Sequence, residues 1–269
     1  MTTSAMNEDL ISRHSEPERV EAHHRFQLAA FFRLLAMFGM TDHIYTHVSA
    51  AVPGAGGQRH FLINPYGLRF EEVTASNLVK IDMDGNPVEA TEYPVNPAGF
   101  TIHSAIHAVR HDAICVAHTH TRAGMAVAAL KDGLLPISQI SLQFHDRLAY
   151  HDYEGIALDL SERERLQRDL GDRDAMMLAN HGLLTAGRSI PHAFSLMYYL
   201  NKACEIQISA LSMARDLVLP PADVCEHTAR QYEAGLGTPV DAFIESDGLE
   251  MEWQAFVRLL DRQDPSYRN

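Results

Sequence analysis

Apolar positions near the N-terminus recur three or four residues apart, and this spacing predicts an amphipathic helix. The helix begins after Ser15, which forms a capping-box pattern with Glu18, and it ends at Gly39. Residues 1–14 are polar and are predicted to form a flexible tail. The apolar positions that define the helix are Phe26, Leu28, Phe31, Phe32, Leu34, Leu35 and Phe38.

Short runs of β-branched and aromatic residues predict strands at 44–48 and 60–63. The glycine-rich segment 53–57 lies between them and precedes no helical pattern, so it favours a hairpin turn over a phosphate-binding loop. A further apolar run, 113–116, predicts a buried strand that continues toward His118.

Helical spacing returns at 98–110, and a second capping-box pattern at Ser161 predicts the start of another helix. Pro191 begins a long helix, and two more polar helices follow it. Helices and strands alternate irregularly rather than as repeated βαβ units, which favours an α/β fold with a mixed or antiparallel sheet between helices. We expect one main domain over 15–220 and a helical extension over 221–269.

Composition and charge narrow the function classes. At 269 residues and 46% hydrophobic content, the chain can bury a full core as one large domain. A formal net charge of -13 without any basic cluster argues against nucleic-acid or anionic-membrane binding. No apolar run approaches the roughly 18 residues of a membrane span, and no secretory leader pattern is present, so a cytoplasmic location is predicted. The cysteines form no Cys-x-x-Cys pair and are predicted to be reduced and mostly buried: Cys115, Cys204 and Cys225.

Histidines supply the strongest candidate chemistry. His118 and His120 follow the run 113–116, and side chains two apart on a strand point to the same face. A divalent metal takes a neutral nitrogen from each imidazole, and His181, at the end of another apolar run, is the best third ligand. Three histidine ligands with an open position are typical of a catalytic zinc-type site. The alternative is that each is an ordinary core or surface residue, since 16 histidines make some chance clustering expected.

Four motifs carry a resemblance to a known family. They are Asn96-Pro97-Ala98-Gly99-Phe100, the helix pair His103 and His107, His118-Thr119-His120-Thr121, and Ala179-Asn180-His181-Gly182. This ordered set resembles the class II aldolase and adducin head family, from roughly Pro17 to Leu211. The resemblance implies a three-layer α/β/α sandwich, commonly assembled as a homo-oligomer of four with the site near the subunit interface. It also implies that His118, His120 and His181 bind a divalent metal, with zinc as the expected ion and manganese, iron and cobalt left open.

The chain departs from the family's sugar-phosphate pattern in several places. The position four before His103, where such members carry an acid, is Gly99. The family's Gly-Asn-x-Ser loop is Thr46-His47-Val48-Ser49 here, and its Thr-Pro-Ser-Gly turn is Asn64-Pro65-Tyr66-Gly67. No Arg or Lys replaces the lost phosphate donors within these motifs, so a sugar-phosphate substrate is not expected. The candidate substrate-binding residues are His47, Asn64 and Gln139, the last near the place of an aldolase tyrosine.

The sequence offers two places for proton transfer. His103 lies one helical turn from His107, and either could act as acid or base, ligate the metal as a fourth group, or only cross-link the helix to a neighbouring loop. Tyr153 and Glu154 precede Gly155 in a polar loop that is a candidate lid with acid/base groups, and a plain turn fits the same pattern.

The resemblance implies aldolase, epimerase or dehydratase chemistry, in which a metal polarises a carbonyl and holds an enediolate. Decarboxylation would not need the missing acid, because the metal takes up the charge left when carbon dioxide departs. We therefore expect a metal-dependent carbon-carbon lyase that acts on a small, non-phosphorylated oxygenated acid or carbonyl compound. The alternatives are an adducin-like scaffold, which would be free to lose its histidines, and a sugar-phosphate aldolase or epimerase.

Overall fold

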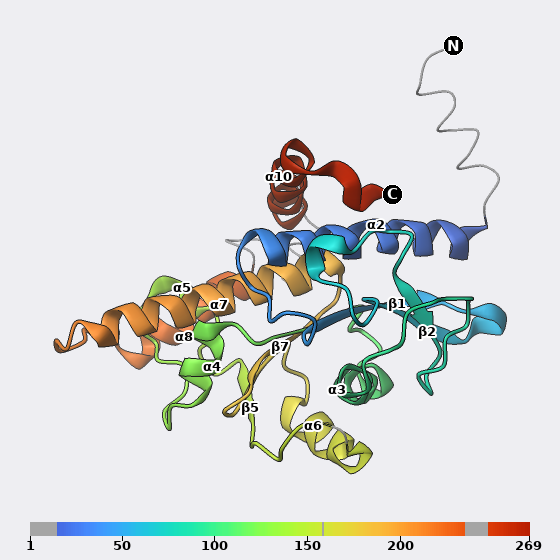
Figure 1. Ribbon diagram of the computed structural model, residues 1–269. Helices are drawn as coiled ribbons and strands as arrows, with labels where there is room; N and C mark the ends of the chain where they lie inside the picture. The colour runs from blue at the N-terminus through green and yellow to red at the C-terminus, as the bar shows by residue number, and fades with distance from the viewer. Residues whose placement is uncertain (1–14, 158, 235–246) are drawn as a thin grey trace.

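A seven-stranded mixed sheet forms the middle layer of the protein (Figure 1). The computed structural model describes residues 15–157, 159–234 and 247–269. The strand order across the sheet is β3-β2-β1-β4-β7-β6-β5, and among the described strands only β5 and β6 pair in parallel. The strands are β1 (His47–Pro53), β2 (Arg59–Ile63), β3 (Val79–Ile81), β4 (Cys115–Thr119), β5 (Leu148–His151), β6 (Ala175–Leu178) and β7 (Gly182–Gly187).

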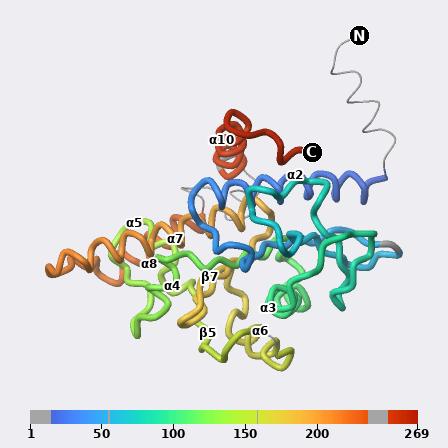
Figure 2. Tube along the Cα trace, viewed as in Figure 1, coloured from blue at the N-terminus to red at the C-terminus, as the bar shows by residue number. Residues whose placement is uncertain are grey.

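Helices cover both faces of the sheet, as Figure 2 shows. One face packs against α2 (Glu16–Met37) and α7 (Ile190–Ser212), with α10 (Asp247–Gln263) outside them. The other face packs against α3 (Pro97–Val109) and α6 (Arg163–Leu170). The remaining helical elements are α4 (Arg122–Ala128), α5 (Gln139–Leu142), α8 (Ala222–Glu233), η1 (Ala55–Gly57), η2 (Phe70–Glu72), η3 (Leu160–Glu162) and η4 (Pro265–Arg268). This arrangement confirms the predicted three-layer α/β/α sandwich.

Strand alternation sorts the side chains of β1 and β4 between the two helical layers. Ala117 of β4 belongs to the apolar core beneath α2 and α7, whereas Val116 belongs to the core beneath α3 and α6. Because side chains two apart on a strand share a face, His118 points to the α3 side with Val116. His47 lies opposite His118 in the β1–β4 pairing, and Ser49 follows on the same face. The sheet therefore gathers polar side chains beneath α3.

Two predictions about local structure were wrong. The strand expected at 44–48 is shifted to β1, because His43 has a left-handed backbone (φ 52°) and the chain turns before it can pair. The capping box expected at Ser161 does not form. The Asp159 carboxylate instead accepts the Ser161 N–H at 2.8 Å and caps η3, which leads into α6 at Arg163.

The described part of the predicted extension 221–269 packs on the main domain. Trp253, Val257 and Leu260 of α10 belong to the same buried apolar cluster as α2 and α7. All three cysteines are free and buried, as predicted. The tail predicted at 1–14 lies outside the described residues. Among the helices described, none is long and apolar enough to cross a membrane.

Candidate metal centre

Three histidines converge at one end of the sheet. His118 lies near the end of β4, His120 immediately follows it, and His181 lies in the turn between β6 and β7. One ring nitrogen from each lies within 4.8 Å of the others, and the Nε2 atoms of His118 and His120 are 2.8 Å apart. The structure thus brings together the three histidines that the sequence singled out, from segments some 60 residues apart.

The backbone around His181 explains why a glycine follows it. A Cβ atom on Gly182 would lie 2.4 Å from the carbonyl oxygen of Thr119, so β7 can begin beside β4 only without a side chain there. Asn180 adopts a left-handed conformation (φ 57°), and its N–H donates to the Ala128 carbonyl. These constraints hold the His181 turn against the end of β4.

Acceptors outside the centre fix the orientation of two imidazoles. The Nδ1–H of His118 donates to the Leu183 carbonyl at 3.0 Å, and that of His120 donates to the Asp42 carboxylate at 2.8 Å. In neutral rings each Nε2 then carries a lone pair, and metal-binding histidines are commonly held this way. Two lone pairs 2.8 Å apart repel each other unless a cation lies beside them, so this donor set fits a bound cation. The sequence did not predict Asp42 as a partner of His120, because it lies in a turn 78 residues away along the chain.

Burial favours the neutral form of His118 and His181. Burial, followed by the neighbouring His47 and His181, holds the pKa of His118 well below its usual range. The pKa of His181 falls to about 4 through burial and then through His120 and His151. Neutral imidazole is the form that ligates a metal.

A second polar chain links β1 with α3 behind the centre. The His47 ring lies 5.1 Å from the His118 ring, and its Nδ1 lies 2.8 Å from His103 Nε2. His103 Nδ1 is 2.6 Å from the Ser49 hydroxyl, which is also 2.8 Å from His107 Nε2. Both nitrogens of His103 are therefore engaged, and the structure places His103 behind His47 rather than at the histidine centre.

The loop that carries Tyr153 and Glu154 is anchored on α6. Glu154 forms an ion pair with Arg165, whose hydrogen bond is the main influence lowering the pKa of that carboxyl. His151, just before the loop, pairs with Asp169 at 2.7 Å. Tyr153 lies 6.4 Å from the His181 ring between centroids and is 54% exposed. The tyrosine thus borders the centre, whereas the glutamate is turned toward α6.

Two buried polar atoms lie at the same end of the sheet without hydrogen-bond partners in the described part of the chain. They are the Asn64 side-chain carbonyl oxygen and the Thr46 hydroxyl, and the Asn64 amide donates to the Thr46 carbonyl at 3.4 Å. Unpaired buried polar atoms are expected where a ligand supplies the missing partner. The sequence pattern pointed to Asn64 as a candidate substrate-binding residue but not to Thr46. Gln139, by contrast, is exposed and lines a hollow against α8.

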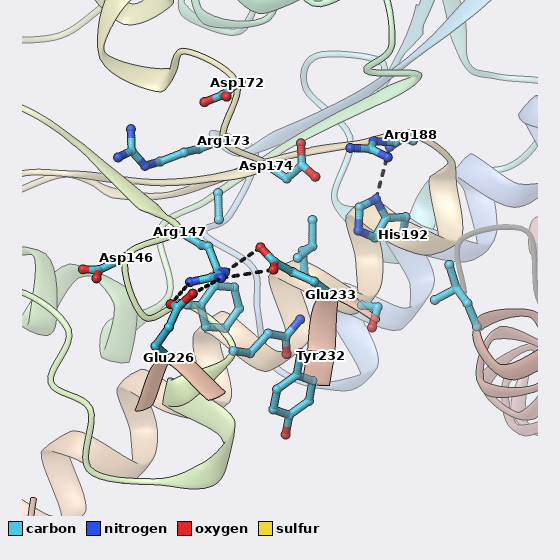
Figure 3. Close-up of a pocket in the computed structure, with 16 residues that line it drawn as sticks. Asp146, Arg147, Asp172, Arg173, Asp174, Arg188, His192, Glu226, Tyr232 and Glu233 are labelled. Carbon is cyan, nitrogen blue, oxygen red and sulfur yellow. Dashed lines mark hydrogen bonds and ion pairs between the residues drawn. The ribbon is translucent and has the colours of Figure 1, made fainter. Parts of the chain in front are cut away.

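A large cavity lies elsewhere, beside the start of β6 (Figure 3). It measures about 870 Å³, and Arg147 lies within it between Glu226 and Glu233 of α8. Because two carboxylates neutralise this arginine, it is a structural link between elements rather than an anion site. His181 follows the opposite end of β6, so the candidate centre is separate from this cavity.

Comparisons with known proteins agree with this geometry. Residues 26–208 match the model of the Class II Aldolase and Adducin N-terminal domain. An aldolase II superfamily protein from Pseudomonas syringae is 51% identical, with a TM-score of 0.86 over 97% of this chain and 100% of that one. An L-fuculose 1-phosphate aldolase from Glaciozyma antarctica is 26% identical, with a TM-score of 0.79 over 95% and 96%. Alpha-adducin from Mus musculus is 42% identical over 88% of this chain, which spans 33% of the adducin.

Proposed function

Because this chain belongs to the class II aldolase and adducin family, we propose that it is a metal-dependent lyase. Its substrate in this proposal is a small, non-phosphorylated oxygenated acid or carbonyl compound, cleaved by decarboxylation or by a retro-aldol reaction. The observation that carries the proposal is the pair of outwardly anchored imidazoles, His118 and His120, whose Nε2 atoms face each other beside His181.

His118, His120 and His181 would hold the metal. Zinc is the first choice for three neutral imidazoles, and manganese, iron and cobalt suit the same donors. The bound ion would supply a Lewis acid that stabilises negative charge on a substrate oxygen.

The surrounding residues divide the remaining tasks. Thr46 and Asn64 would orient the substrate, since each offers a buried polar atom that lacks a partner among the described residues. Tyr153 would restrict water at the open side and carry a proton at its phenol, while Glu154 would position the loop through Arg165. In this scheme His103 acts on the site only through His47.

The absence of phosphate from the proposed substrate rests on the hydroxyl of Ser49. This hydroxyl is hydrogen-bonded to His103 and His107, so it is not available to a phosphate. Similarity to an L-fuculose 1-phosphate aldolase keeps the sugar-phosphate alternative testable. Turnover of a small phosphorylated ketose would favour that alternative.

Similarity to alpha-adducin supports the second candidate function, a scaffold without catalysis. A scaffold has no need of a metal, whereas the lyase cannot work without one. Because the scaffold could retain or lack a metal, a purified protein without metal would exclude the lyase, and a metal-loaded protein is then tested for turnover.

We also propose that the chain forms a homo-oligomer, with a tetramer favoured. The C-terminal end of α7 extends beyond the sheet (Figure 1). Ile208 and Leu211 near this end, and Met213 just after it, are exposed. Exposed apolar side chains close in sequence at the end of a helix favour packing against another chain. Light scattering after size exclusion would test this, and a monomeric wild type would contradict it. The cytoplasmic location stays a prediction.

The test begins with metal analysis of the wild type beside His181→Ala and a control, His60→Ala, which alters a buried histidine of β2. We expect about one ion per chain in the wild type and the control, and loss of that ion in His181→Ala. Loaded protein is then assayed against hydroxy and keto acids for carbon dioxide or a released carbonyl product. A wild type that stays free of metal after incubation with zinc or manganese would refute the lyase and favour the scaffold.

A further inference from the structure

The His47 ring stands between the histidine centre and α3. It is 2% exposed, with ring centroids 4.6 Å from His103 and 5.1 Å from His118. Its Nδ1 is engaged by His103, but its Nε2 has no hydrogen-bond partner among the residues that the structure describes. A ring nitrogen without a protein partner, on a nearly buried ring next to a metal-type centre, is suited to contact a ligand.

Gly99 of α3 leaves room for this ring. A Cβ atom at position 99 would lie 2.8 Å from Cδ2 and 3.0 Å from Cγ of His47. Gly99 lies in the first turn of α3, where the backbone is helical and any residue is allowed. The glycine is therefore required by the space that the imidazole fills and not by backbone conformation.

The hydrogen-bonded chain behind His47 fixes the direction in which its ring points. Ser49 has one hydroxyl proton, so it donates to one of His103 and His107 and accepts from the other. This fixes the His103 ring through both nitrogens, and His103 in turn fixes Nδ1 of His47. The ring cannot rotate away from Gly99 without breaking a buried hydrogen bond.

We infer that His47 contacts the substrate through Nε2 beside the metal centre, and that Gly99, His103 and Ser49 position it. The inference rests on the proposed metal-dependent function. The ligand class is a small oxygenated acid that carries a hydroxyl, amide or carboxylate within reach of His47. An imidazole nitrogen pairs with any of these, as donor or as acceptor.

The experiment uses the full chain loaded with Co²⁺, with acetohydroxamate as the probe, because it chelates through two oxygens and carries a polar N–H. Binding is followed by the visible absorption of the cobalt. His47→Ala and Gly99→Ala should each weaken probe binding about tenfold while cobalt content stays unchanged. The double variant should bind no more weakly than His47→Ala, because the added methyl acts only by displacing the ring.

The matched controls are His60→Ala and Gly54→Ala. A Cβ atom on Gly54 would lie 2.7 Å from the His60 ring, which repeats the same packing at a buried histidine away from the centre. Both controls should bind the probe like the wild type. If His47→Ala does not fold, as judged by circular dichroism, His47→Asn and Gly99→Ala still test the contact.

Wild-type probe affinity in His47→Ala or His47→Asn would refute the contact. Additive losses in the double variant would refute positioning by Gly99. A wild-type protein that takes up no cobalt would refute the proposed function itself, so the two failures are distinguishable.

Discussion

Asp42 should set the metal affinity of the centre although it does not ligate the ion. Its carboxylate accepts a hydrogen bond from His120 Nδ1 at 2.8 Å, which holds the ring with Nε2 toward His118. Replacing Asp42 with alanine removes this acceptor and leaves the imidazole free to rotate or to change tautomer. The perturbation therefore reaches the metal only through the orientation and basicity of one ligand.

The magnitude follows from the exposure of the pair. Loss of such an outer partner typically costs between about 10- and 100-fold in metal affinity. Asp42 is 45% exposed, so water can replace part of the lost hydrogen bond and the effect belongs at the lower end. We expect about a tenfold rise in the zinc dissociation constant for Asp42→Ala, or roughly 1.4 kcal/mol. Asp42→Asn keeps an acceptor oxygen without the charge and should cost about threefold.

Competition with a chromophoric chelator measures the affinity, with Asp84→Ala as the control because Asp84 lies in an exposed turn outside the centre. The order of affinity should be wild type and control, then Asp42→Asn, then Asp42→Ala. An Asp42→Ala variant that binds zinc as tightly as the wild type would show that His120 is oriented by something else.

Three further outcomes are expected. Gly182→Ala should lose about 3 kcal/mol of stability in urea titrations together with its metal, since the new methyl would overlap the Thr119 carbonyl. Normal metal content in this variant would contradict the packing. In metal-free protein, burial lowers the pKa of His181 to about 4, so the unfolded chain takes up a proton at this histidine at a higher pH than the folded chain does. The free energy of unfolding should therefore fall by up to about 3 kcal/mol as the pH falls from about 6.5 to about 4. Denaturant titrations should show a weaker pH dependence in His181→Asn. Trp253→Ala should lower the free energy of unfolding by about 3–5 kcal/mol, because α10 packs this ring into the core. The control Met251→Ala alters an exposed side chain of the same helix and should lower it by less than about 0.5 kcal/mol. Equal denaturation midpoints for the two variants would contradict the packing of α10.

The sequence alone predicted the features that depend on residues close together in the chain, such as helices and the face to which a strand residue points. The spacing of apolar residues located α2 and α7, because the roughly 3.6-residue period of a helix is visible in the residues of that helix alone. The two-residue spacing of His118 and His120 predicted a shared face, and their Nε2 atoms do meet. His181 was singled out by the apolar run that it ends, and only the resemblance to a family joined it to the other two histidines, since nothing local links them.

Only the tertiary structure decided which groups surround those histidines. Asp42 accepts a hydrogen bond from His120, and His47 lies between His103 and the histidine centre. Both contacts depend on the pairing of β1 with β4. No short segment of sequence encodes that pairing. Glu154 is held by Arg165 for the same reason, since its partner lies on a separate helix. Periodicity fixes the face to which a side chain points, whereas the order of strands and helices fixes what it meets there.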